Sequence, residues 1–353
     1  MYATATPARP RYTAIQILTG QRAFYPAAAA YAALFLPASI LAMGARGAQW
    51  HAHEMLFGFA LAVVAGNQLG TLTGWRLYLI FAAWAAARIA FLTAPDSVLS
   101  DASNIFFVAL LALQAAPRLL GAAKKWRNQA LPVTLLALCF SVLGFHLGQN
   151  VLGAAVLLFA LLMLFMGGRL IAPAVAGQLE RQGLRLATRV QPRIEGALII
   201  AMALAVAASL ASDFFVGIFS VTAGLLAGVR LWRWRLWALR RRPDLLCLAA
   251  GYAWLAFGLI VYGAFTNTVA LHFITVGAIG TLTFNVMALA WLLRARRDPA
   301  RSSIIVWGTV LIAVAVLARA AGEYYAAAAA WSAAFMLLLA LFAASGRRRA
   351  ISG

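Results

Sequence analysis

Acidic side chains and cysteine are scarce in this chain of 353 residues. Aspartate and glutamate number 9 together against 29 lysines and arginines, and charged residues make up only 11% of the sequence, whereas soluble domains carry about a quarter. Cys139 and Cys247 both fall in apolar stretches, which excludes a disulfide framework and a CxxC-type site. Paired catalytic carboxylates, a phosphate-binding glycine loop and a Ser/His/Asp arrangement are also missing. Hydrolytic and nucleotide-driven chemistry are therefore not expected.

Apolar residues are abundant instead, at 64% of the chain, and the mean hydropathy is +0.88. The apolar runs have the length of roughly 17 to 25 residues that a membrane-spanning helix needs. We predict an all-α polytopic membrane protein with about twelve transmembrane helices, in a domain over residues 24–344 between a polar N-terminal segment, 1–23, and a basic tail, 345–353. The predicted helices are 24–44, 51–70, 76–94, 98–120, 129–147, 151–172, 194–211, 213–231, 245–264, 269–292, 303–320 and 323–344.

The basic residues provide an independent indication of topology. With the N-terminus in the cytoplasm, the cytoplasmic segments of a twelve-helix chain contain 25 of the 29 lysines and arginines. Cytoplasmic loops of membrane proteins carry such an excess, so both termini are predicted to be cytoplasmic. The net charge of +20 lies in short clusters between apolar runs and not along one soluble face, so membrane lipid is the expected partner and nucleic acid is not.

The four histidines all fall at the outer side in this topology. His51 and His53 open the second predicted helix, His146 closes the fifth, and His272 opens the tenth. Three helices thus present imidazole at similar depth, as a haem or a transition metal held between helices requires. The alternative is that interfacial histidines only cap helix ends. Ionisable residues at this depth are costly, which makes Glu54, directly after His53, a candidate acid or base.

Two further expectations concern geometry within the membrane. On a regular helix His51 and His53 point to nearly opposite sides, and Glu54 returns to the face of His51, so a single metal bound by both histidines requires an irregular turn. Arg88 lies in the outer half of the third predicted helix, where an unpaired guanidinium is costly. It is expected to contact an anion and to help hold a cofactor. Its candidate partners are Glu54, Asp96, Asp101 and a haem propionate.

Two stretches, WHAHEMLFGFALAVVAG at Trp50–Gly66 and LHFITVGAIGTLT at Leu271–Thr283, closely resemble the signature segments of the NnrS family. The resemblance implies a multi-pass protein of the bacterial inner membrane that contains haem, expected to be b-type, and copper. It further implies a role in nitric oxide metabolism, denitrification or relief of nitrosative stress. The segments that agree less strongly are Gly144-Phe145-His146-Leu147, Gly167-Gly168-Arg169 and Gly251-Tyr252-Ala253-Trp254.

The resemblance also implies which residues hold the cofactors. His51, His53, His146 and His272 lie in the matching segments and are the implied metal ligands, with His53 and His272 the favoured haem pair. The chain has alanines at 249 and 250, where the family commonly has a histidine, which leaves fewer ligands for copper. Nitric oxide is the implied ligand, and the chain could be an oxidoreductase that reacts with it. The alternative is a proton-coupled secondary transporter with an outer-side histidine and glutamate site.

Overall fold

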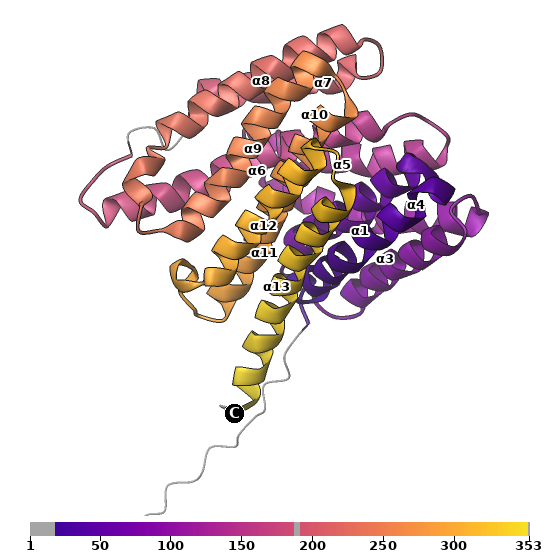
Figure 1. Ribbon diagram of the computed structural model, residues 1–353, viewed down its shortest axis with the longest axis horizontal. Coiled ribbons are helices and arrows are strands. Elements are labelled where there is room, and N and C mark those ends of the chain that lie inside the picture. Colours follow the sequence, from indigo (N-terminus) through magenta and orange to yellow (C-terminus); the bar gives the residue numbers. More distant parts are fainter. Residues whose placement is uncertain (1–17, 187–190, 352–353) are drawn as a thin grey trace, which may run out of the picture.

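The computed structural model describes residues 18–186 and 191–351, with side chains up to residue 344. Residues 1–17 of the N-terminal segment therefore lie outside the described residues. So does Arg189, one of the basic residues counted as cytoplasmic in the predicted topology. The described chain is a bundle of helices (Figure 1). In chain order its elements are α1 Gly20–His53, the π-helix η1 Glu54–Ala60, α2 Leu61–Gln68, α3 Trp75–Thr93, α4 Val98–Ala122, α5 Trp126–His146, α6 Leu152–Glu180, α7 Pro192–Ala208, α8 Asp213–Arg233, the short η2 Leu236–Leu239, α9 Pro243–Phe265, α10 Thr268–His272, the π-helix η3 Phe273–Gly280, α11 Thr281–Arg294, the short η4 Pro299–Arg301, α12 Ser303–Ala320 and α13 Tyr324–Ile351.

The predicted all-α membrane fold is confirmed. Ten helical stretches in the described residues are long and apolar enough to cross a membrane. The first two predicted helices form one helical stretch, Gly20–Gln68, which is interrupted at Gly47, where φ is 79° and ψ is 165°. The seventh, α7, has 17 residues, one short of the length required of the other spans. Backbone groups inside a bilayer must bond within the segment, which is why every long apolar run here is helical.

The helices form two groups with α6 between them. In Figure 1 the early helices α1, α3, α4 and α5 lie on one side, and α7, α8 and α9 lie on the other. The late helices α12 and α13 pack against each other, and α13 also packs along α1. Every residue from 154 to 165 of α6 is buried, as expected for a helix that is apolar on all faces.

Helices α8 and α9 approach each other closely at glycines. A Cβ atom placed on Gly217 would lie 2.6 Å from the backbone oxygen of Gly263, and the reverse distance is also 2.6 Å. Further along α8 lie Gly224 and then Gly228. A Cβ on Gly224 would meet the backbone oxygen of Ala256 at 2.7 Å, whereas a Cβ on Gly228 would meet nothing within 4 Å. Small residues of this kind let membrane helices pack at short range.

Gly224 and Gly228 provide a matched test of the packing. Gly224→Ala is expected to lower the free energy of unfolding by about 1–3 kcal/mol, because the new methyl group must displace backbone of α9. Gly228→Ala on the same helix is expected to leave it unchanged or to raise it by up to about 1 kcal/mol. Denaturation of the purified protein in mixed detergent micelles measures both values. Equal effects of the two substitutions would contradict the assigned α8–α9 interface.

Candidate functional site

A π-helix follows directly after each of two histidines. η1 begins at Glu54, next to His53, and η3 begins at Phe273, next to His272. Both π-helices fall inside the two stretches that carry the family resemblance. The wider turn of a π-helix shifts the angular position of the residues in it, and such segments occur frequently at functional sites. The side chains near each histidine therefore do not follow regular α-helical spacing.

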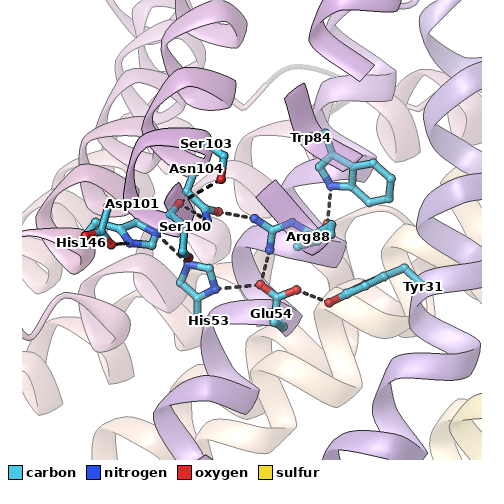
Figure 2. A network of polar contacts seen from close by, with 11 residues as sticks. Tyr31, His53, Glu54, Trp84, Arg88, Ser100, Asp101, Ser103, Asn104 and His146 are labelled. Atoms are coloured by element: carbon cyan, nitrogen blue, oxygen red, sulfur yellow. Dashed lines mark hydrogen bonds and ion pairs between the residues drawn. The ribbon is translucent and has the colours of Figure 1, made fainter. Parts of the chain in front are cut away.

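Glu54 is the centre of a buried polar network (Figure 2). Its side chain has no exposed surface, and Arg88 from α3 is 3% exposed. Arg88 Nη1 donates to Glu54 Oε1, and the Tyr31 hydroxyl from α1 donates to Glu54 Oε2. His53 Nδ1 also contacts Glu54 Oε1, at 2.9 Å. Glu54 accepts all of these bonds and is therefore an ionised carboxylate with Arg88 as its counter-ion.

The second terminal nitrogen of the Arg88 guanidinium is bound by a residue of α4. Arg88 Nη2 donates to Asn104 Oδ1, and Asn104 Nδ2 in turn donates to the backbone oxygen of Ser100 at 2.9 Å. Gly58 in η1 makes room for the ion pair, because a Cβ there would lie 2.9 Å from Arg88 Nη1 and 3.0 Å from Glu54 Oε2. Among the partners predicted for Arg88, the structure brings Glu54 to it. Asn104 was not among them.

His53 faces His146 from α5. The two Nε2 atoms lie 3.2 Å apart, and both side chains are buried, at 0% and 2% exposure. His146 Nδ1 contacts Asp101 Oδ1 of α4 at 2.7 Å, and the Asp101 side chain is 41% exposed. Each imidazole of this pair thus has a carboxylate at Nδ1 and the other imidazole at Nε2 (Figure 2).

This arrangement determines where the ring protons lie. An ionised carboxylate only accepts hydrogen bonds, so Glu54 and Asp101 each require a proton on the Nδ1 they contact. The Nε2 atoms of neutral His53 and His146 then carry lone pairs that point at each other across 3.2 Å. Such a contact is unfavourable unless a positive charge lies between the nitrogens, either a shared proton or a metal ion. Histidine ligands of metal ions show the same pattern of a carboxylate at the other ring nitrogen.

Aromatic rings enclose the His53–His146 pair. Phe91 stacks on the His53 ring with the centroids 3.7 Å apart, and Phe145 and Phe57 lie at 4.7 Å and 5.2 Å. These rings exclude water from one side of the pair and fix the orientation of the imidazole. A low-dielectric wall strengthens the interactions of any charge held between the two nitrogens.

His51 and His272 occupy a separate place beside this network. His51 Nδ1 lies 2.8 Å from Ser39 Oγ, and His272 Nδ1 donates to the backbone oxygen of Thr268 at 2.5 Å. His272 and Arg319 are electrostatic neighbours of His51. Within the described part of the chain, neither Nε2 atom has a protein hydrogen-bond partner, so both remain available as ligands. The structure therefore brings His53 and His146 into contact and leaves His51 and His272, which are electrostatic neighbours, outside that contact.

His53 with His146 and His51 with His272 suit different cofactors. Two imidazole nitrogens on one tetrahedral metal ion lie about 3.3 Å apart, because each metal–nitrogen bond is roughly 2.0 Å long, and the His53–His146 separation of 3.2 Å matches this value. The same separation leaves no space for a porphyrin plane between the nitrogens. His51 and His272, held at Nδ1 and half-buried, instead have the donor chemistry of haem axial ligands. No three His, Cys, Asp or Glu side chains of the described residues converge as a metal ligand set.

Four residues of the site were absent from the sequence-based ligand set: Tyr31, Ser39, Asn104 and, as the partner of His146, Asp101. The polar run Ser100-Asp101-Ala102-Ser103-Asn104 at the start of an apolar helix is the signal that could have identified two of them. Asp101 and Asn104 are three residues apart and so lie on one face of α4.

Comparison with known proteins identifies the chain. No curated protein and no solved structure matches it. The family model described as NnrS protein matches residues 17–345, nearly the whole length. The match includes both histidine motifs with their π-helices and every residue of the network around Glu54. This polytopic helical membrane protein belongs to the NnrS family.

Proposed function

We propose that this protein handles nitric oxide at a metal centre near the outer face of a bacterial inner membrane and so relieves nitrosative stress. The observation that carries the proposal is the contact between His53 and His146, two carboxylate-backed imidazoles whose Nε2 atoms converge at 3.2 Å. Family membership supports the ligand and the pathway, including denitrification. Nitric oxide is small, uncharged and soluble in lipid, so it reaches a buried site without a hydrophilic channel.

His53 and His146 would hold a copper ion, and His51 and His272 would hold a b-type haem, with Arg319 near enough to the second pair to attract a propionate. When bound, these groups supply redox electrons and an open coordination position for a diatomic ligand. The residues of the chain prepare the site. Glu54 and Asp101 keep the protons of the pair on Nδ1, so that both Nε2 lone pairs are free.

Arg88 and Tyr31 hold Glu54 in its ionised form and prevent it from rotating away from His53. The aromatic enclosure keeps bulk water from His53, which protects a reactive centre from side reactions. We therefore assign Glu54 primarily to positioning the imidazole, with the relay of protons as its further role.

Anaerobic titration with nitric oxide tests the proposal. The reduced, metal-replete protein in detergent is expected to change its visible spectrum in proportion to the nitric oxide added, and the protein prepared without haem and copper is expected to show no change. Consumption of nitric oxide, followed with an electrode, would establish an oxidoreductase, and a stable spectrum without consumption would establish binding or sensing. A metal-replete protein that does not respond at all would refute the proposed function.

A second candidate function, proton-coupled transport, has one specific observation in its favour. Contacts run without interruption from Asp101, at 41% side-chain exposure, through His146 and His53 to the fully buried Glu54. Chains of ionisable groups of this kind carry protons in pumps and transporters. Proton uptake by proteoliposomes in the absence of copper and haem would favour this function over the metal-based one.

A further inference from the structure

A second buried arginine lies in α8, a helix that contributes no residue to the histidine site. Arg230, near the end of α8, is 4% exposed, close to the 3% of Arg88. Arg88 has the carboxylate of Glu54 beside it. Arg230 Nη1 donates to the backbone oxygen of Leu164 at 3.0 Å, and no carboxylate of the described residues lies within the 4.0 Å of an ion pair. One full positive charge is therefore buried there without a protein counter-ion.

Donor groups without partners surround this charge. Three buried atoms in the cluster have no partner that meets hydrogen-bond geometry: Arg230 Nε, Trp234 Nε1 and the Tyr252 hydroxyl. The Trp234 and Tyr252 rings are fully buried, with centroids 4.9 Å apart, and the Arg230 guanidinium lies 5.6 Å from the Trp234 ring centroid. The Tyr252 hydroxyl also lies close enough to Arg230 for a side-chain hydrogen bond, in which the guanidinium donates and the hydroxyl keeps its own proton to donate. The cluster thus offers donors from α8 and α9, and its side-chain acceptor is the Tyr252 hydroxyl beside Arg230.

Helix α6 is shaped to receive these side chains. A Cβ on Gly168 would lie 1.8 Å from Arg230 Nη2, and a Cβ on Gly167 would lie 2.5 Å from the Tyr252 ring. Both glycines and Tyr252 come from the segments Gly167-Gly168-Arg169 and Gly251-Tyr252-Ala253-Trp254, which share the family resemblance but contribute nothing to the histidine site. These segments converge on Arg230 instead.

We propose that Arg230, Trp234 and Tyr252 form a binding site for a small monovalent inorganic anion, a halide or a planar oxyanion. A buried, unpaired guanidinium is costly in a bilayer, and an anion is the partner that removes the cost. Glu195, an electrostatic neighbour of Tyr252, is already used, because it accepts from Arg127 Nη1 at 3.0 Å. A single unpaired charge balances a monovalent ligand, and the neutral N–H and O–H groups replace part of its hydration shell. Exposed arginines at 235, 240 and 241 raise the local concentration of anions at this end of α8.

The experiment measures the anion dependence of thermal unfolding in the purified full-length protein. Sodium chloride or bromide replaces sodium gluconate at constant ionic strength, and a saturable rise in Tm is expected. Tyr252→Phe and Trp234→Phe each remove one donor and keep an aromatic ring, so each is expected to raise the midpoint concentration roughly ten-fold. The controls Tyr262→Phe in α9 and Trp237→Phe in η2 are expected to leave the midpoint unchanged.

The possible outcomes distinguish a bound anion at Arg230 from water or from no ligand. Anomalous scattering from bromide beside Arg230 in a crystal would locate the ligand directly. No saturable effect in the wild-type protein, or an unchanged midpoint in both donor variants, would overturn the site, as would density at Arg230 that refines as water without an anomalous signal. Neither nitric oxide nor a metal takes part in these measurements, so their result is independent of the function proposed above.

Discussion

His146→Ala is expected to reduce the copper that co-purifies with the protein by at least ten-fold and to leave the bundle folded. His146 supplies one of the two Nε2 atoms that converge at 3.2 Å, and nothing else among the described residues could replace it beside His53. Its ring is buried at the end of α5, so the truncation leaves a small cavity, and the Asp101 carboxylate that loses its partner is 41% exposed and can be solvated. Metal content measured by mass spectrometry, alongside the thermal unfolding curve, gives both values.

Two further variants distinguish a ligand from a structural histidine. Asp101→Asn keeps the size of the side chain but no longer fixes the proton on His146 Nδ1, and it is expected to weaken copper binding by roughly 10–100-fold. His272→Ala is expected to retain copper and to lose or shift the haem absorption bands, because His272 lies in the other pair. Copper that remains at the wild-type level in His146→Ala would remove this pair from the metal site.

The helical fold followed from the sequence because the bilayer leaves the backbone little choice. An apolar run such as 98–120 must satisfy its own hydrogen bonds, and the structure has α4 at Val98–Ala122. The short breaks predicted after residues 94 and 320 also separate helices, since α3 ends at Thr93 and α12 ends at Ala320. The orientation of the bundle in the membrane stays a prediction from the arginine distribution.

The detail of the site could not be obtained from regular spacing. A uniform helix places Glu54 on the face of His51, but η1 begins at Glu54, and the carboxylate contacts His53 instead. No local sequence pattern predicts a π-helix, because its stability depends on packing against neighbouring helices. The contact of His53 with His146 spans 93 residues of sequence. The family resemblance favoured His272 as the partner of His53, because these two histidines lie in the two signature segments.

Arg88→Leu is expected to lower the free energy of unfolding by about 3–5 kcal/mol, since it leaves the carboxylate of Glu54 buried without a counter-ion. The ion pair joins η1 to α3 and, through Asn104, to α4. Arg88→Lys keeps the positive charge but cannot reach Glu54 and Asn104 together, so its effect is expected to be milder. The exposed Arg76→Leu on the same helix serves as the control and should change stability by no more than about 0.5 kcal/mol.

A double variant shows whether the charge pair itself causes the loss. Adding Glu54→Gln to Arg88→Leu removes the unpaired carboxylate charge of Glu54 and is expected to restore part of the stability. The double-mutant cycle is expected to give a coupling energy of roughly 1–3 kcal/mol. Copper retention should not recover with it, because the neutral amide introduced at position 54 no longer requires the proton on His53 Nδ1. Recovered stability with lost copper would show that Arg88 acts on the metal site through Glu54. Full copper and haem occupancy in Arg88→Leu would instead limit the ion pair to a structural role.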